Sequence, residues 1–238
     1  STFIQKFMQN FVLDNITNKH DKERATDEMP AACDGVMVMT TKPQFVPAEA
    51  VKVKIGNASM SVRLIDSVGY MVDGALGAYD GASPRLVKTP WSAEEIPFTQ
   101  AAALGTEKVI SNHSTIAVVM TTDGSFSSIP RANFVEAERQ AIEQAKLTGK
   151  PFVVVLNSSM PEATSTKEMA KKISAEYDVS VVPMNVNELK KEDIDNSFNL
   201  VSFKIFTCPS FTISVVEFVP PTETLICSGL TGSCIYCS

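Results

Sequence analysis

Between residues 115 and 195 the sequence alternates short, continuous apolar runs with longer amphipathic segments. The apolar runs, which predict strands, cover residues 115–120, 151–156 and 180–184. The amphipathic segments, which predict helices, cover residues 133–148, 165–177 and 186 to about 195. Continuous apolar strands separated by amphipathic helices are typical of a parallel sheet with helices on both faces. The pattern therefore predicts an α/β fold with a mostly parallel sheet.

The first half of the chain adds an antiparallel hairpin to this sheet. Residues 51–55 alternate apolar and basic side chains, Gly56 and Asn57 are typical of a turn, and residues 60–65 are mostly apolar. Apolar residues at positions 3, 4, 7, 8 and 11 predict a helix at the start of the chain. We expect residues 14–47 to form mainly a loop with a short helix near 19–27. Residues 69–100 are expected to form an extended loop before a helix at 101–111.

Composition limits the classes of function. The 238 residues are 44% hydrophobic and 20% charged, as in an ordinary globular chain with one large core. The net charge of −6 argues against a protein that binds nucleic acid through its phosphates. No apolar run reaches the ~18 to 20 residues that span a bilayer, and the start lacks the layout of a signal peptide. We therefore expect a cytoplasmic protein.

The composition changes after residue 195, which predicts a domain boundary between residues 1–195 and 196–238. The second segment has Lys204, Glu217 and Glu223 as its only charged residues and contains four of the five cysteines. We expect a tail that is foreign to the domain, either translated out of frame or disordered, and a small β-rich appendage is the alternative. Its C-x-x-C pair, Cys234 and Cys237, is a weak zinc signal because no second pair or histidine is near.

The residues with the clearest chemical meaning follow the apolar run 62–65. Asp66 ends this predicted strand, and Gly69 completes a D-x-x-G pattern. An acid at the end of a strand in an α/β sheet can hold the water shell of a phosphate-bound Mg²⁺, and a glycine can offer a mobile backbone amide to the phosphate. The alternative interpretation of Asp66 is a turn former or helix cap.

Hydroxyl groups stand where a phosphoryl-transfer site needs them. Ser1 and Thr2 begin the first helix and match the end of G-x-x-x-x-G-K-[ST], with Ser1 as the candidate Mg²⁺ ligand. Thr40 and Thr41 lie between that helix and the hairpin, like a threonine that contacts Mg²⁺ in the triphosphate state. A helix cap at Ser1 and a solvated threonine pair are the alternatives. Taken together, the order predicts a P-loop NTPase of the translation-factor-related class, which has one antiparallel strand pair.

Several longer motifs resemble the ATPase domain of the stage IV sporulation protein A family, over roughly residues 1–195. They are residues 1–8 (STFIxKFM), 39–47 (MTTKPQFVP), 62–70 (VRLIDSVGY), 89–91 (TPW), 96–98 (IPF), 113–116 (HSTI), 121–124 (TTDG) and 149–152 (GKPF). The resemblance implies an ATPase that self-assembles upon ATP hydrolysis into the basement layer of the bacterial endospore coat. It also implies a place on the mother-cell face of the outer forespore membrane, other coat proteins as partners, and recruitment by a small amphipathic membrane-bound peptide.

The same resemblance implies roles for individual residues. Ser1 would supply the Mg²⁺ hydroxyl, Thr40 and Thr41 would sense the γ-phosphate, with Thr41 on the metal, and Asp66 would be the Walker B acid. Thr2, Gly69 and Asn157 are further expected nucleotide contacts. The first strand of such a fold, and the glycines and lysine of its phosphate loop, are not found before Ser1, so we expect this chain to bind nucleotide weakly and to be inactive alone.

Two positions differ from the motifs of GTPases, and they bear on which nucleotide is bound and on the rate of hydrolysis. A guanine site requires N-K-x-D after the strand 151–156, whereas this chain has Asn157-Ser-Ser-Met160, which argues for ATP over GTP. Tyr70 stands where many GTPases place a water-orienting glutamine, so slow turnover coupled to assembly is expected. A non-catalytic scaffold and a GTPase of degenerate base specificity are the alternative functions.

The other noticeable side chains are interpreted as structural. Phe3, Phe7 and Phe11 are expected in the core. On the predicted helix 133–148, three glutamates are expected to form a solvated face with Arg139, namely Glu136, Glu138 and Glu143.

Overall fold

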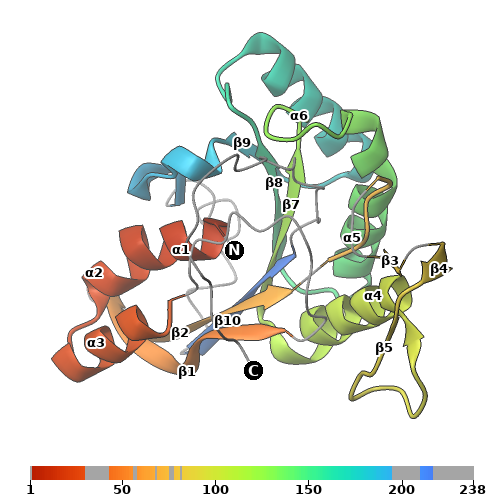
Figure 1. Cartoon of the computed structure of the whole chain (residues 1–238). Coiled ribbons are helices and arrows are strands. Elements are labelled where there is room, and N and C mark those ends of the chain that lie inside the picture. The colour runs from red at the N-terminus through yellow and green to blue at the C-terminus, as the bar shows by residue number, and fades with distance from the viewer. Residues whose placement is uncertain are drawn as a thin grey trace, which may run out of the picture.

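A computed structural model describes residues 2–29, 43–55, 58–67, 69–74, 78–80, 82–194 and 210–216. Its centre is a six-stranded sheet in the order β1-β2-β10-β7-β8-β9 (Figure 1). The strands are β1 (Gln44–Ile55), β2 (Ala58–Ser67), β7 (Ile116–Thr122), β8 (Phe152–Asn157), β9 (Val181–Met184) and β10 (Ser210–Val216). Only β1 runs antiparallel to its neighbour in this sheet. The predicted α/β class, with a mostly parallel sheet and one antiparallel hairpin, is confirmed.

One face of the sheet is covered by the N-terminal helices. They are α1 (Thr2–Phe7), the π-helical turn η1 (Met8–Val12), α2 (Leu13–Asn15) and α3 (Lys19–Asp27). Phe3, Phe7 and Phe11 stack along this segment with ring centroids 5.9 and 5.2 Å apart, and all three are buried. They form a first core cluster with apolar side chains of the sheet such as Val62 and Val155. The expected core position of the aromatic stripe is therefore confirmed.

The opposite face carries the second group of helices, which lie together on the other side of the sheet in Figure 1. They are α4 (Phe98–Lys108), the π-helical turn η2 (Val109–His113), the 3₁₀ turn η3 (Arg131–Phe134), α5 (Val135–Leu147) and α6 (Thr164–Tyr177). Their apolar faces form a second core cluster with Val119, Val154 and Leu156. Helix α5 ends where Gly149 takes the positive φ of 64° that a helix C-terminal glycine favours.

Three expected elements differ in the structure. The prediction of one helix over residues 186–195 is wrong, because a 3₁₀ turn η4 (Val186–Glu188) is followed by separate helical residues 191–194. The break occurs because Leu189 leaves the helical conformation, with a ψ of 121°, and because Lys190 N donates to Asp193 Oδ2 at 2.9 Å, which starts a new turn. Strand β1 begins at Gln44 and not at 51, because a bulge between Val46 and Val51 hides its alternation. Helix α4 begins three residues earlier than expected and continues as η2.

The expected loop 69–100 contains short antiparallel pairs. They are β3 (Tyr79–Asp80) with β4 (Ser83–Pro84), and β5 (Leu86–Val87) with β6 (Ile96–Pro97). Two-residue strands of this kind add few ladder bonds, so the segment is close to the extended loop with turns that the sequence predicts. Among the described residues, no helix is long and apolar enough to cross a membrane.

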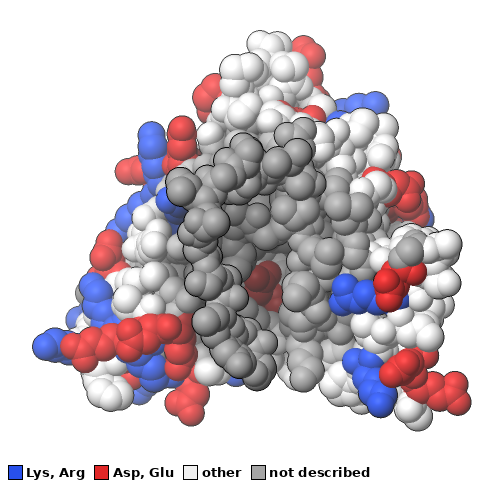
Figure 2. Space-filling model, in the orientation of Figure 1, with Lys and Arg blue, Asp and Glu red and all other residues white. Residues whose placement is uncertain are grey.

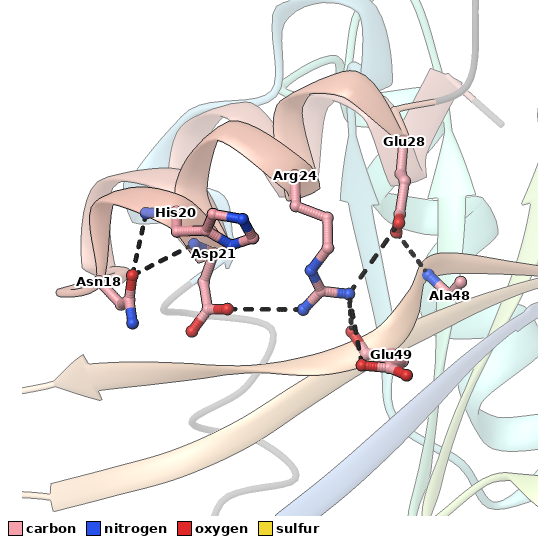
Figure 3. Close-up of polar contacts among 7 residues, drawn as sticks. All are labelled: Asn18, His20, Asp21, Arg24, Glu28, Ala48 and Glu49. Atoms are coloured by element: carbon pink, nitrogen blue, oxygen red, sulfur yellow. Dashed lines mark hydrogen bonds and ion pairs between the residues drawn. The ribbon is translucent and has the colours of Figure 1, made fainter.

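Side chains of α3 cover the bulge of the edge strand β1 (Figure 3). Asn18 caps the helix by accepting from His20 N at 2.9 Å. Glu28 Oε2 accepts from Ala48 N at 2.8 Å, and Arg24 Nη1 donates to Glu49 O at 3.5 Å. Two backbone groups of the bulge, Ala48 N and Glu49 O, therefore have side-chain partners from α3 and its C-cap.

Strand β10 lies inside the segment that we predicted to be a separate tail. It occupies the centre of the sheet, parallel to β2 on one side and to β7 on the other. The cysteines Cys208, Cys227, Cys234 and Cys237 fall outside the described residues. The predicted boundary at residue 195 stays a prediction.

Candidate functional site

Asp66 lies next to the end of β2, at the carboxyl edge of the parallel strands. It is partly exposed, and its register partners are Gln44 in β1 and Val215 in β10. The following residue, Ser67, is buried and donates from Oγ to Val215 O at 3.1 Å. This bond fixes the end of β2 against the central strand, and it holds the Asp66 backbone in a defined place.

The glycine of the D-x-x-G pattern has the backbone conformation that its residue type favours. Gly69 has a φ of 76°, which is in the left-handed region. Tyr70, directly after it, is 9% exposed and packs in the second core cluster. Burial, and to a smaller extent the charge of Glu107, raises the pKa of Tyr70 to about 12. The Tyr70 side chain is therefore a core residue and is not placed to orient a water molecule in solvent.

The register gives the spacing between Asp66 and Asn157. Asp66 is level with Val215, Val118 and Val153 across the sheet, and Asn157 lies four residues beyond Val153 at the end of β8. With ~3.3 Å per residue and ~4.8 Å between strands, the two side chains are separated by about 13 Å along the strands and about 14 Å across them. A nucleotide lying across the ends of β10 and β7 would span such a separation.

The loops after β7, β8 and β9 are joined by hydrogen bonds at the Asn157 end of this edge. Asn157 Oδ1 accepts from Val186 N at 3.0 Å, and Asn157 O accepts from Asp123 N at 3.2 Å. Ser125 Oγ accepts from Ser159 N at 2.9 Å. Because Asn157 bonds to both neighbouring loops, its carbonyl oxygens organise the edge where the sequence predicts the base.

Ser158 is fully buried beside these loops. Its hydroxyl lies 3.3 Å from Thr166 Oγ1 and accepts from Met160 N at 3.1 Å. The hydroxyl is therefore directed into the protein and fixes the loop after β8 against helix α6. Met160, two residues later, is 66% exposed.

A buried polar cluster at the end of β7 was missed by the sequence reasoning. Glu138 is 1% exposed, and its Oε2 accepts from Thr121 Oγ1 at 2.6 Å. Arg131 Nη2 donates to both carboxylate oxygens of Glu138, at 2.9 and 2.7 Å. The expected solvated position of Glu138 is therefore wrong, whereas Glu136 and Glu143 do pair with exposed Arg139. The signal was available, because Glu138 lies in the stripe that also contains Phe134, Ala141 and Ala145.

Lys150 fixes the end of η2 from the loop before β8. Its Nζ donates to the backbone oxygens of Ile110, Ser111 and Ser114, at 2.9, 2.5 and 2.7 Å. Burial lowers the pKa of Lys150 below its usual value. A cation at the C-terminal end of a helical segment satisfies carbonyl groups that have no partner within the helix.

The structure places four of the predicted site residues. Thr2 is exposed at the start of α1, Asp66 and Asn157 lie at the carboxyl ends of β2 and β8, and Gly69 follows β2. Ser1, Thr40 and Thr41 lie outside the described residues. Within the ranges that are described, no three His, Cys, Asp or Glu side chains form a metal-binding group. The expected donors, one carboxylate and hydroxyl groups, are the oxygen ligands that Mg²⁺ accepts when phosphate oxygens and water complete its shell.

Charged side chains of both signs alternate around the rim of the face shown in Figure 2, and acidic atoms are visible near its middle. On this face, the described charged side chains form no large patch of a single sign. The observation agrees with the net charge of −6.

Comparison with known proteins gives one consistent result. The family described as "Stage IV sporulation protein A, ATPase domain" matches residues 1–205. The stage IV sporulation protein A of Clostridioides difficile (strain 630) is 46% identical over 224 residues, covering 94% of this chain and 45% of the relative. The proteins of the same name from Bacillus subtilis (strain 168) and Bacillus anthracis are 46% and 42% identical, over 82% and 90% of this chain and 40% and 43% of the relatives. No solved structure matches the chain significantly.

The chain thus spans less than half of the length of these curated relatives. Coverage of 94% in the Clostridioides difficile comparison is more than residues 1–195 alone could supply, so that alignment continues past residue 195. The family match also ends beyond it, at residue 205.

Proposed function

The chain belongs to the stage IV sporulation protein A ATPase-domain family, and on that premise we propose that it is the ATP-hydrolysing part of a self-assembling spore-coat protein. The observation that carries the proposal is the position of Asp66 at the carboxyl edge of a mostly parallel sheet, on the strand that pairs antiparallel with β1. This is the edge at which ligands bind in open α/β sheets.

The residues with oxygen-containing side chains near the end of β2 would have different roles around the phosphates of the nucleotide. Asp66 would hold Mg²⁺ through its water shell, Ser1 and Thr41 would offer hydroxyl ligands, and Thr40 would respond to the γ-phosphate. A bound Mg²⁺ supplies neutralisation of the charge that develops on the phosphate oxygens. The backbone amide of Gly69, whose positive φ turns the chain after β2, would donate to the same phosphate.

The base end supports ATP as the nucleotide. A guanine site uses a carboxylate to accept from the ring, and the loop after β8 has no acid at the expected position in Asn157-Ser-Ser-Met160. The side-chain oxygens of Asn157 and Ser158 are already bonded within the protein. We therefore propose that the base is held by the backbone and the apolar side chains of this loop.

The burial of Tyr70 supports slow turnover. With this side chain in the second core cluster, the attacking water has to be oriented by another group, such as a threonine, a backbone amide or a neighbouring copy. Dependence on a neighbouring copy would couple hydrolysis to assembly. The expected partners are therefore further copies of the chain and other coat proteins.

The proposed location is the mother-cell cytoplasm, at the surface of the outer forespore membrane and in the spore coat. The names of the three relatives refer to sporulation, which supports this setting. A small amphipathic membrane-bound peptide would provide indirect attachment to the membrane, and nucleic acid is not an expected partner. Binding of the chain to vesicles that carry an amphipathic peptide, but not to bare vesicles, would support this attachment.

The function is tested by adding the first strand of the fold and a G-x-x-x-x-G-K loop directly before Ser1 and measuring MgATP binding by calorimetry. Residues 1–238 alone are expected to bind MgATP weakly, and the longer chain tightly. In the longer chain Asp66→Ala should abolish phosphate release, whereas Asp73→Ala, at an exposed position, should leave it unchanged. Tight MgATP binding by residues 1–238 alone would contradict the expected inactivity of this chain. Equal hydrolysis by the Asp66→Ala variant would contradict the proposed role of the acid.

A non-catalytic scaffold is the second candidate, because the burial of Tyr70 fits a chain without catalysis as well as it fits slow turnover. In that case the longer chain would assemble at the same rate and to the same extent with ATP, with GTP and without nucleotide. Light scattering of the three samples separates the two functions. A preference for GTP in competition would instead support the third candidate, a GTPase of degenerate specificity.

A further inference from the structure

The strand β10, which lies inside the sheet, is far in sequence from the two strands that it pairs with, β2 and β7. Strand β10 lies between β2 and β7, although residues 68–115 separate these two strands and the nearest described residue before β10 is Ile194. We call the space that β10 fills the β2–β7 slot. We propose that this slot is a strand-accepting site, and that β10 of a second copy of the chain can fill it in place of the chain's own β10.

The slot holds its occupant mainly through backbone groups. β10 pairs with β2 from Ser210↔Ser61 to Val216↔Ser67, and with β7 from Ile213↔Ile116 to Val216↔Val119. At its start, Thr115 N donates to Thr212 O at 2.7 Å, and Thr212 N donates to Thr115 Oγ1 at 3.3 Å. Near its end, Ser67 Oγ donates to Val215 O. Backbone ladders of this kind are formed equally well by a strand of another chain, as in strand addition to sheets.

The side chains of β10 decide which strand fits. Ile213 and Val215 enter the first core cluster, Val216 enters the second, and all three are fully buried. A strand with apolar groups on both faces is therefore required, and the same segment of a second copy meets this requirement at every position. An exchanged β10 would make the same contacts as the original one, so the exchange costs no side-chain packing.

One residue weakens the hold of the slot on its occupant. Ser214 is 0% exposed, and among the described residues its Oγ has no hydrogen-bond partner. A buried hydroxyl without a partner is unfavourable compared with an apolar group of similar size. This position therefore makes release of β10 easier than it would be for a wholly apolar strand, and it offers a substitution with a predicted sign.

Exchange of this strand would link copies of the chain. Reciprocal exchange between two copies closes a dimer, whereas one-way donation from each copy to the next gives an open polymer. The proposal concerns contacts between copies and needs no nucleotide. Its failure would therefore leave the proposed ATPase function untouched, and failure of hydrolysis would leave the strand exchange untouched.

The test uses the full chain of residues 1–238 in two isotopic forms, one light and one heavy, mixed without nucleotide. Native mass spectrometry should show oligomers of mixed mass that grow with time. Ser214→Ala should slow their appearance by about tenfold, because it removes the unpartnered hydroxyl. Ile213→Ala should accelerate it, because it removes buried apolar surface from the strand. Leu147→Ala, at an 81% exposed position, is the control and should change nothing.

A synthetic peptide separates strand exchange from ordinary dimerisation. A fluorescent peptide of residues 209–218 should bind to the full chain by anisotropy and should block formation of mixed oligomers. The same peptide with Asp in place of Ile213 and Val215 should do neither. The proposal would be overturned if no mixed oligomers form even near the denaturation midpoint. It would also be overturned if they form at the same rate in the Ser214→Ala chain, or if both peptides act alike.

Discussion

Glu138 accepts a hydrogen bond of 2.6 Å from the hydroxyl of Thr121, and the pair joins helix α5 to the end of strand β7. Arg131 completes the cluster from the 3₁₀ turn before α5. The cluster is almost wholly enclosed, since Glu138 is 1% exposed. It therefore ties the β7 loop, which also bonds to Asn157, to the helical layer beneath it.

Replacing Glu138 by Ala should destabilise the fold strongly. The change leaves the guanidinium of Arg131 and the hydroxyl of Thr121 without their partner, and breaking a buried ion pair from one side costs about 3–5 kcal/mol. Urea unfolding followed by circular dichroism measures the loss. Glu143→Ala on the exposed side of the same helix is the control and should leave the midpoint unchanged. Equal midpoints for the two variants would contradict a structural role of the cluster.

Replacing Lys150 by Met should loosen the end of η2. The substitution keeps most of the aliphatic stem but removes the donor to three backbone oxygens, and we expect a loss of about 1–3 kcal/mol. Hydrogen exchange of the amides near residues 109–114 should accelerate more than exchange in α6. Lys172→Met, at an exposed position of α6, is the matched control. Unchanged exchange near η2 would show that water replaces the ammonium group without cost.

The raised pKa of Tyr70 predicts loss of stability at alkaline pH. The phenol has a pKa near 10.0 in the unfolded chain and about 12 in the fold, so the folded state retains the proton between these values. The contribution is present below pH 10 and is lost as the pH rises toward 12. Buried Tyr70→Phe should therefore flatten the fall of the unfolding free energy in this window.

The control for this titration is Tyr79→Phe, because Tyr79 is 64% exposed. Burial also raises the pKa of Tyr177 to about 12, so Tyr70→Phe should remove only part of the slope. Unfolding free energies from urea titrations at several pH values between 9 and 12 give the comparison. An identical slope in the Tyr70→Phe and Tyr79→Phe chains would contradict the burial of the Tyr70 phenol.

Removing the carboxylate of Glu28 should open the edge of β1. Glu28→Ala leaves Ala48 N without its acceptor at the bulge, with an expected loss of about 1 kcal/mol. An edge with open backbone groups also invites pairing with other chains, so the variant should aggregate faster on mild heating. Glu23→Ala, on the exposed side of α3, is the control. Thermal unfolding together with light scattering measures both effects.

The local patterns of the sequence were sufficient for most of the sheet. Strands β7, β8 and β9 were predicted to within about two residues because continuous apolar runs next to amphipathic helices have few other solutions. Gly69, with its φ of 76°, has the positive φ that glycine accommodates most readily. These features depend on residues that are close together in the sequence, so the local sequence pattern was sufficient to predict them.

The features that were missed depend on partners distant in sequence. Glu138 is buried because Thr121 and Arg131 meet it, and the charge pattern of α5 alone indicated a solvated face. The core position of Tyr70 follows from the packing of the second cluster after a turn, which no periodicity encodes. The place of β10 in the sheet could not be predicted, because its pairing with β2 joins residues far apart in the chain.

The central position of β10 also determines when this fold can be completed during synthesis. As the chain leaves the ribosome, β1 and β2 can pair early and β7, β8 and β9 later, but the two groups of strands have no common neighbour until residue 216 has emerged. Until then, the free edges of β2 and β7 are exposed to solvent, and pairings between strands this far apart in sequence form slowly. The nascent chain should therefore depend on chaperones from the time β7 has emerged until β10 has entered the sheet between β2 and β7.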